Sequence, residues 1–486
     1  MTEPRDPATE DWITAARRLA AGQATLASLW GDVGCVRMAL HDHGRADLTM
    51  LTLPCPDCGF PSVGAVHPPA IRLERAIDDL FGYRATDAPD GRPWLDHGRW
   101  PIRAPLGAAP ANEGPAERYA FLAAEGPGLH QIPVGPVHAG IIEPGHFRFH
   151  ASGETVVRLE ARLGYVHKGV NTLMRGASLE RGGKLAARIS GDSTVAYQFA
   201  FARAAEAALG VRAPARACFL RGMFAEVERL ANHFGDIGAI CNDASFSLMH
   251  AHCGIMRERV LRACAAAFGH RLMMDTIVPG GVAVDLAPSG REAICALIAN
   301  IREVLPRLVT LYDNTASLQD RTVRTGMLRT ALAFEYGCGG YIGRASGRDF
   351  DARRGFPYSP YDELRFEVPL LTQGDVNARV WIRVREVEQS LEILDQILAR
   401  LPGGPARAET GARGRECEGH ALVEGFRGDV FAALRLTAEG TIGNAHLRDP
   451  SWFQWPLLEA VIERNIVADF PLCNKSFNCS YSGHDL

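Results

Sequence analysis

Apolar residues recur at intervals of three and four over long stretches of this 486-residue chain, which is the spacing of a helix with one buried face. The run from Pro214 to Ile240 has this pattern, and so does the run from Ile294 to Leu311, in which Pro306 should produce a kink. The most regular run extends from Arg379 to Leu401 and stops at Pro402-Gly-Gly-Pro405. These patterns predict a bundle of long helices, in which functional sites form between facing helices or at loops at the bundle end.

Alternating apolar and polar residues predict strands in other parts of the chain. Such runs occur at Cys35–Leu40 and Asp47–Leu53, and an amphipathic helix from Ile71 to the stop at Gly82 follows them. This part predicts an α/β unit of about 105 residues. The composition then shifts to Ala, Pro and Gly, which is typical of a linker.

Further strand patterns lie beyond this linker. A β-hairpin is predicted from Gly135 to Leu163, with its turn at Ala151-Ser-Gly-Glu154. Another strand is predicted at Asp429–Leu436, before a polar run from Asn474 to Leu486. The predicted fold class is therefore α+β, with an N-terminal α/β domain and a mainly helical second domain that carries a hairpin at its start and a small β region near its end.

Composition excludes several classes of protein. Hydrophobic residues make up 47% of the chain and charged residues 22%, so extended disorder is excluded. The formal net charge of −4 gives no basic surface for nucleic acid. The first residues lack the basic and apolar pattern of a signal peptide, and no run reaches the ~20 apolar residues of a membrane span. We therefore expect membrane association only through partner proteins or surface contact.

Twelve cysteines are scattered along the chain without the dense spacing of a disulfide framework, which favours a reducing compartment. The one CxxC motif, Cys55-Pro-Asp-Cys58, has no second CxxC and no nearby histidine pair. A reduced loop pair is the favoured interpretation, and a metal site is the alternative. Phosphate-loop, GxSxG and HExxH motifs are absent from the sequence, so nucleotide binding is unsupported.

Four separated segments, taken in order, resemble the large subunit of membrane-bound, energy-converting nickel-iron hydrogenases. This family is homologous to the hydrogenase-like quinone-site subunit of NADH-quinone oxidoreductase (complex I). The resemblance extends over about residues 120–486. The segments are Ile132–Phe149 (IPVGPVHAGIIEPGHFRF), Leu163–Gly169 (LGYVHKG), Phe224–His233 (FAEVERLANH) and Ala468–Asn478 (ADFPLCNKSFN).

The first part of the chain adds to this resemblance. Phe60–Gly82, followed by Gly91-Arg-Pro, is similar to the small peripheral subunit of complex I, which is fused to the large subunit in hydrogenases of the formate-hydrogenlyase type. The resemblance implies a small-peripheral-subunit-like domain at residues 1–105, a linker at 106–130 and a large-subunit-like domain at 131–486.

The resemblance also locates the residues that would hold nickel and iron. The family uses four cysteine thiolates, and Ser190, Ser193, Ser480 and Gly483 stand at their positions here, with Tyr197 at the usual histidine. Neutral hydroxyl groups do not replace thiolates for a soft transition metal, and glycine has no side chain. We therefore expect no metal on this chain and no hydrogen activation. Cys479 neighbours one ligand position, where a structural role is favoured.

The quinone site of complex I is not retained in its usual form. Its histidine and tyrosine fall at Ile142 and Gly191, so the head group would lack its hydrogen-bonding partners. Quinone binding is thus unsupported by the usual residues, and a relocated site stays open. No cofactor is predicted on this chain, whereas an iron-sulfur cluster is expected on a partner small subunit.

Six residues remain as candidates for catalysis or proton transfer. Glu143 matches the glutamate that passes protons in the hydrogenases, and a bond to backbone amides is the equal alternative. His138 lines the same loop, where structural hydrogen bonding is slightly favoured over proton transfer. The full set is Glu143, His138, Arg188, Asp192, Tyr197 and Asp243.

The other four candidates are Arg188, Asp192, Tyr197 and Asp243. Arg188 could hold an anion, although an internal ion pair with Asp192 is favoured. Asp243 aligns with an aspartate that supports the quinone histidine of complex I, and with His233 on the same helix it could begin a proton path. His233 is equally compatible with a core histidine satisfied by a carbonyl group.

The resemblance implies a peripheral-arm subunit of a complex I-like membrane oxidoreductase that couples electron transfer to proton or ion movement. Its partners would be an iron-sulfur small subunit and antiporter-like membrane subunits, on the cytoplasmic face of the cell membrane. A catalytically silent scaffold that links these partners is the alternative. A working hydrogenase with rearranged ligands is the third hypothesis.

Overall fold

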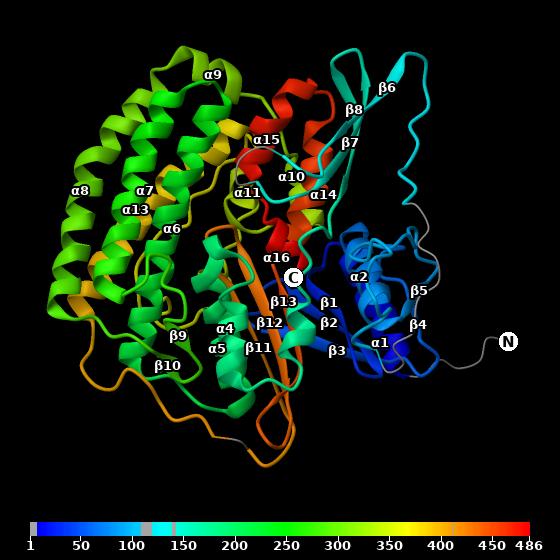
Figure 1. Cartoon of the computed structure of the whole chain (residues 1–486), viewed down its shortest axis with the longest axis horizontal. Helices are drawn as coiled ribbons and strands as arrows, with labels where there is room; N and C mark the ends of the chain where they lie inside the picture. The colour runs from blue at the N-terminus through cyan, green and yellow to red at the C-terminus, as the bar shows by residue number, and fades with distance from the viewer. Residues whose placement is uncertain (1–6, 108–118, 139–141, 412) are drawn as a thin grey trace.

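The computed structural model describes residues 7–107, 119–138, 142–411 and 413–486. It is an α+β structure, as predicted: long helices form one side, and small antiparallel sheets lie beside them (Figure 1). Within these described ranges, no helix has the length and apolar content needed to cross a lipid bilayer.

The N-terminal unit contains a three-stranded antiparallel sheet in the order β1-β2-β3. The strands predicted from alternation are β2 and β3, and the predicted helix is α2, which ends at Gly82 in the left-handed conformation (φ 73°). The unit comprises α1 (Pro7–Ala20), β1 (Ala24–Asp32), β2 (Cys35–Asp42), β3 (Leu48–Pro54), β4 (Gly59–Pro61), η1 (Pro68–Ala70), α2 (Ile71–Phe81) and β5 (Arg84–Thr86).

The predicted hairpin is present as part of a second three-stranded sheet. Strands β6 (Leu129–Val134), β7 (His146–Ser152) and β8 (Thr155–Arg162) pair in sequence order, and Ser152 lies opposite Thr155 at the predicted turn. A third antiparallel sheet has the order β11-β12-β13 and includes the predicted strand near the C-terminus. Its strands are β11 (Cys417–Glu424), β12 (Asp429–Leu436) and β13 (Ile442–Arg448).

Four long helices lie side by side at the left of Figure 1. They are α6 (Ala215–Asp243), α7 (Ser247–Phe268), α8 (Pro288–Asp313) and α13 (Val376–Arg400), and three of them confirm the helices predicted from periodicity. Pro306 lies inside α8, and the kink expected there stays a prediction. The apolar stripes of these helices form the largest buried cluster together with α5 and the inner face of β11–β13.

Shorter elements connect these layers. Near the site discussed below, η2 (Gly191–Ser193) leads directly into α5 (Thr194–Leu209). The remaining elements are α3 (Val170–Met174), α4 (Leu179–Ala186), β9 (Ile277–Val278), β10 (Gly281–Val282), α9 (Ala316–Thr322), α10 (Thr330–Glu335), α11 (Gly340–Ala345), α12 (Ala352–Gly355), α14 (Ser451–Ile462), η3 (Val467–Asp469), α15 (Phe470–Phe477) and α16 (Tyr481–Asp485).

The polar C-terminal run ends in a buried segment. All residues of Tyr481–Leu486 are buried, and the Leu486 carbonyl oxygen accepts hydrogen bonds from the backbone of Lys168 and Gly169 at 2.7 and 3.2 Å. A second apolar cluster joins this segment and α14 to the N-terminal unit, and Arg72 of α2 binds Glu459 of α14 at 2.7 Å. The boundaries assigned to the two domains and to the linker, much of which lies outside the described residues, stay predictions.

Candidate functional site

The four positions assigned to the lost metal ligands meet in one pocket. Ser190 immediately precedes η2 and Ser480 caps α16, and their Oγ atoms lie 3.0 Å apart. The backbone N–H of Gly483 donates to Ser480 Oγ at 2.8 Å. Because residues nearly 300 positions apart converge here, the geometry agrees with the ligand positions that the sequence resemblance implies.

An ion pair occupies one side of this pocket. Asp192 accepts hydrogen bonds from Ser190 Oγ at 2.6 Å and Ser193 Oγ at 3.3 Å, and Arg427 binds both of its carboxylate oxygens. Burial opposes ionisation of this carboxyl, yet the Arg427 guanidinium lowers the pKa of Asp192 to about 2. The pocket therefore contains a fixed, internally neutralised charge pair.

A second hydrogen-bonded pair occupies the other side. Tyr197 is fully buried, and its OH donates to Asp449 Oδ2 at 2.7 Å. Burial raises the pKa of Tyr197 well above its ordinary value, so the phenol stays neutral and acts as a donor. A Cβ atom at Gly483 would lie 2.5 Å from Asp449 Oδ2 and 2.8 Å from Tyr197 OH. The space that a side chain at position 483 would need is therefore filled.

These donors do not suit a nickel-iron centre. The ligand positions provide neutral hydroxyl oxygens and no thiolate, and burial raises the pKa of the neighbouring Cys479 far above its ordinary value, which keeps it a thiol. Across the ranges that the structure describes, no group of three or more His, Cys, Asp or Glu residues could hold a metal ion. In the CxxC motif, Cys55 is buried, Cys58 is exposed and both are free.

The predicted ion pair between Arg188 and Asp192 is wrong. Arg188 lies on the outer side of the turn before η2, where it binds both carboxylate oxygens of Asp275 at 2.7 and 2.8 Å. Its side chain is 47% exposed. Asp192 pairs instead with Arg427, which enters the pocket from the loop between β11 and β12. Arg188 is therefore not a pocket residue.

Glu143 and His138 lie at the edge of the pocket. Glu143 is half-buried and accepts the backbone N–H of Ser482 at 3.0 Å, so it caps the start of α16. His138 Nε2 lies 2.8 Å from the carbonyl oxygen of Gly145. Both side chains thus have the structural bonds that were the alternatives to proton transfer, and the segment between them, 139–141, lies outside the described residues.

The structure does not bring Asp243 and His233 together. They lie ten residues apart on α6, which corresponds to about 15 Å along the helix axis. Asp243 is partly buried at the helix end, and this burial raises its pKa. His233 is fully buried, and its Nε2 lies 2.7 Å from Glu386 Oε2 rather than beside a backbone carbonyl group.

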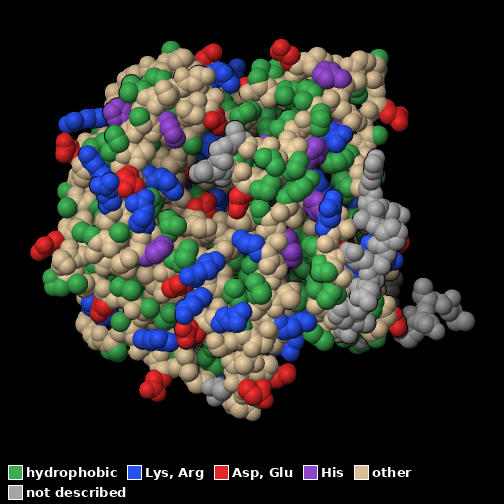
Figure 2. Space-filling view, viewed as in Figure 1, with side chains coloured by type: hydrophobic (Ala, Val, Ile, Leu, Met, Phe, Trp, Pro, Cys, Tyr) green, Lys and Arg blue, Asp and Glu red, His purple; other side chains and the backbone are tan. Residues whose placement is uncertain are grey.

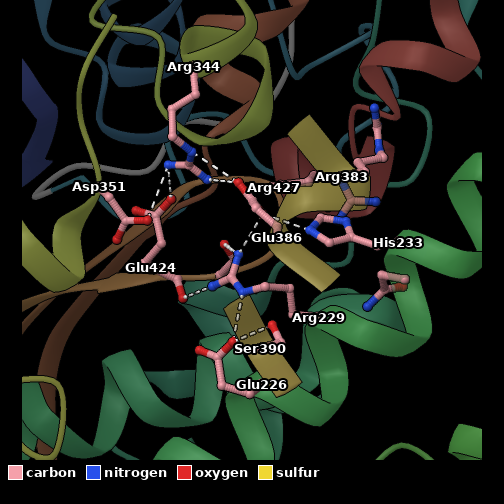
Figure 3. A network of polar contacts seen from close by, with 12 residues as sticks. Glu226, Arg229, His233, Arg344, Asp351, Arg383, Glu386, Ser390, Glu424 and Arg427 are labelled. Atoms are coloured by element: carbon pink, nitrogen blue, oxygen red, sulfur yellow. Dashed lines mark hydrogen bonds and ion pairs between the residues drawn. The ribbon is translucent and has the colours of Figure 1, made fainter. Parts of the chain in front are cut away.

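A buried network of charged groups lies behind the pocket (Figure 3). Glu386 of α13 is at its centre, where it binds Arg344 at 2.5 Å, His233 at 2.7 Å and Arg229 at 3.3 Å. Arg344 also binds Glu424 at 2.9 Å. These side chains are at most 2% exposed, so each charge depends on its partners in place of water.

The network continues along α6 to Glu226. This carboxylate binds Arg353 at 2.9 Å and accepts a hydrogen bond from Ser390 at 2.6 Å, and Arg353 also binds Asp351 at 2.7 Å. Three guanidinium groups thus face four carboxyl groups, which leaves one carboxyl without a cation of its own. Burial and the nearby Asp351 raise the pKa of Glu424, so this carboxyl best accommodates a proton.

Part of this network carries a signal in the sequence. Glu226, Arg229 and His233 are spaced three and four residues apart on one face of α6, inside one of the segments that carry the family resemblance. Polar residues at the spacing of a buried helix face indicate buried partners. The partners themselves lie on α11, α12, α13 and β11, and no local pattern identifies them.

A cleft of about 380 Å³ borders the pocket and shares Asp192 with it. Asn232 and Asp236 of α6 line one wall, and His250 and Arg257 of α7 line the other. Basic and acidic side chains are intermixed over the face shown in Figure 2. The cleft is a second place where a small molecule could contact this part of the chain.

Comparison with known proteins identifies the family of this chain. Residues 244–418 match the family described as the 49 Kd subunit of respiratory-chain NADH dehydrogenase. An NADH-quinone oxidoreductase subunit of Roseiflexus is 32% identical over 352 residues, which cover 70% of this chain and 94% of the relative. The chain belongs to this family.

The family also includes hydrogenase subunits that resemble this chain. Formate hydrogenlyase subunit 5 of Escherichia coli is 30% identical over 88% of this chain and 77% of its own length. The carbon monoxide-induced hydrogenase of Rhodospirillum rubrum is 29% identical over 72% of this chain and 97% of its own length. The resemblance inferred from the sequence segments is therefore confirmed.

A solved structure shows the same fold. A chain of the membrane-bound sulfane sulfur reductase, an archaeal respiratory membrane complex, superposes with a TM-score of 0.69 at 24% identity. The match covers 74% of this chain and 98% of that chain. The shared fold thus covers about three quarters of this chain.

The ion pair in the pocket predicts a pH-dependent contribution to stability. The pKa of Asp192 is about 2 in the fold against an ordinary value of 3.8, so its ionisation stabilises the fold above pH 3.8, and this contribution is lost as the pH falls toward 2. We expect Asp192→Asn to lower the free energy of unfolding by about 1–2 kcal/mol at pH 7. The difference from wild type should shrink between pH 4 and pH 2, as measured by urea denaturation.

The exposed ion pair of Asp275 with Arg188 provides the control. Asp275→Asn removes an ion pair whose side chains are 34% and 47% exposed, and we expect a change below about 1 kcal/mol at pH 7. If Asp192→Asn were as mild as this control at pH 7, the internal charge pair would not hold the pocket together.

Proposed function

We propose that this chain is a peripheral-arm subunit of a hydrogenase-related, complex I-like membrane oxidoreductase that couples electron transfer to proton or ion movement without nickel-iron hydrogen activation. One observation carries the proposal. The four ligand positions converge as in a metal pocket, but they present serine oxygens and a glycine, and the pairs Arg427–Asp192 and Tyr197–Asp449 fill the space.

The residues present do not fit a quinone head group in the manner of complex I. Ile142 is apolar and 44% exposed, and Gly191 has no side chain, so neither offers the hydrogen bond that the carbonyl oxygens of a quinone need. We assign no cofactor to this chain and propose no reaction step that uses a quinone. An iron-sulfur cluster is assigned to a partner subunit.

The chain's own residues can still hold and move protons. Glu143 lies at the edge of the pocket with one oxygen, Oε2, bonded to the backbone, and Asp243 lies partly buried at the end of α6. Each is a carboxyl group between solvent and the interior, and a carboxyl group in such a place can act as a general acid or base. The paired Asp192 and the neutral Tyr197 fix the electrostatic field of the pocket. We propose that Glu143 and Asp243 are the groups that exchange protons.

Partner subunits are supported by the relatives and by the surface of the chain. Two of the relatives are named as subunits, one of formate hydrogenlyase and one of NADH-quinone oxidoreductase. Beside the pocket, Val137 is 84% exposed and Ile142 is 44% exposed, which is unfavourable for apolar side chains unless a partner covers them. We propose an iron-sulfur small subunit there, antiporter-like subunits in the membrane, and a position on the cytoplasmic face.

Isolation of the tagged full-length chain from detergent-solubilised membranes tests this assembly. We expect a stable complex that contains an iron-sulfur protein, detected as iron and acid-labile sulfide, and at least one multi-spanning membrane protein. Recovery of the chain alone from the aqueous fraction, under conditions that keep other respiratory complexes intact, would contradict the proposal.

Two substitutions distinguish a proton-transferring subunit from a silent scaffold. In membrane vesicles that contain the assembled complex, Glu143→Gln and Asp243→Asn should each lower redox-driven proton movement by about 10-fold or more, because a general acid-base group typically contributes 10²–10⁴-fold. Assembly should be unchanged, since each amide is close in shape to the acid it replaces. If both variants pump like wild type, the scaffold hypothesis replaces the relay.

A further inference from the structure

The cleft beside the pocket lies where α6 and α7 approach each other. Its volume of about 380 Å³ falls within the range of small-molecule sites. Gly254 of α7 opens it, because a Cβ atom there would meet nothing within 4 Å. One helix turn along α7, the Arg257 side chain lies across Gly235 of α6, where a Cβ atom would be 3.0 Å from Arg257 Cδ.

The carboxylates of this cleft are already bound by cations. Asp236 accepts hydrogen bonds from Arg383 at 3.0 Å and Asn478 at 2.8 Å. Glu258 binds Arg262 and Arg271, each at 2.8 Å. Asp192 is held by Arg427, as described above. A metal cation or an ammonium group would therefore have to displace an arginine from each of these carboxylates.

Arg257 is the exception among the charged groups of the cleft. Within the part of the chain that the structure describes, its guanidinium has no hydrogen bond and no ion pair. The three carboxylates that line the cleft are bound by four arginines from outside its lining, which are Arg262, Arg271, Arg383 and Arg427. The carboxylates of the cleft are thus neutralised by their own arginines, and the Arg257 guanidinium is left for a ligand.

We propose that this cleft is a binding site for a small oxyanion, held by Arg257. The planar guanidinium offers paired N–H groups to the oxygens of a carboxylate or an inorganic oxyanion. Arg257 is exposed at the cleft, so an anion can reach it from solvent. His250 lies on the same wall as a further donor. The site borders the filled metal pocket but its ligand contact is Arg257, which the proposal on electron transfer does not use, so it stands whether or not that proposal holds.

Calorimetric titration of the full-length chain with sodium formate and sodium sulfate, at constant ionic strength, tests the site. Formate probes a planar carboxylate, and sulfate probes a tetrahedral inorganic oxyanion. We expect saturable binding of at least one of them, weakened about 10-fold or more in Arg257→Gln, because a charge-assisted pair of hydrogen bonds is lost. Gly254→Leu should also weaken binding, since its side chain enters the open part of the cleft.

Arg259→Gln is the matched control. Arg259 lies on the same helix but donates to Asn300 at 2.6 Å, away from the cleft, so this variant should bind the anions like wild type. Circular dichroism and thermal unfolding verify the fold of each variant. Absence of saturable binding by both anions, or equal affinity in wild type and Arg257→Gln, would overturn the proposal.

Discussion

Replacing Glu386 with alanine should lower the free energy of unfolding by about 3–5 kcal/mol, the largest loss that we expect from a single substitution outside the apolar core. Glu386 is 1% exposed and binds Arg344, His233 and Arg229 within 3.3 Å. Its removal leaves two buried guanidinium groups with fewer compensating charges, and water cannot replace the lost carboxylate. Urea denaturation followed by circular dichroism measures the change.

Glu388 on the same helix provides the control for this experiment. Its side chain is exposed, so Glu388→Ala should change the free energy of unfolding by less than about 0.5 kcal/mol. Glu386→Gln should lie between the two, because it keeps the shape and part of the hydrogen bonding but not the charge. A loss below about 1 kcal/mol for Glu386→Ala would show that the network does not stabilise the fold through this carboxylate.

Gly483→Ala should be the second most damaging substitution, with an expected loss of about 2–4 kcal/mol. The added Cβ atom would stand 2.5 Å from Asp449 Oδ2 and 2.8 Å from both Tyr197 OH and Ser480 Oγ. The methyl group must therefore displace buried hydrogen-bonded atoms. Gly254→Ala is the matched control on another helix, where the Cβ atom meets open space and should be neutral or slightly stabilising.

A second substitution tests whether the loss in Gly483→Ala comes from contact of the added Cβ atom with Tyr197 OH. Tyr197→Phe alone removes the hydrogen bond to Asp449 and should cost about 1–3 kcal/mol. Combined with Gly483→Ala, it removes one of the three clashing atoms, so the double variant should be more stable than the sum of the single effects predicts, by about 0.5 kcal/mol or more. If the two changes in unfolding free energy add exactly, the contact with Tyr197 OH is not a cause of the loss in Gly483→Ala.

The helices of the fold could be predicted from the sequence because their burial is periodic. The run from Arg379 to Leu401 corresponds to α13 at Val376–Arg400, and the run from Pro214 to Ile240 to α6 at Ala215–Asp243. Helix α1 was not predicted, although Trp12, Ala15, Ala16 and Leu19 lie on one buried face, because small alanines give a weak apolar signal.

The candidate site could be predicted in position but not in its contacts. The family segments placed Ser190, Ser480 and Gly483 together, and the structure brings them into contact. The partner of Asp192 was predicted as Arg188, four residues away, whereas the true partner Arg427 lies 235 residues away. Arg427 reaches the pocket only through the packing of β11 and β12, and no local pattern in the sequence encodes that packing. The buried partners of His233 were missed for the same reason.

Nickel quantification in the purified, full-length chain and in its membrane complex tests the central claim most directly. Because oxygen donors and two hydrogen-bonded pairs fill the pocket, we expect well below 0.1 nickel per chain by mass spectrometry, even when the cells are grown with added nickel, and no hydrogen-dependent reduction of a viologen dye. About one nickel per chain, together with hydrogen turnover by the pure complex, would contradict the account and restore the hypothesis of a hydrogenase with rearranged ligands.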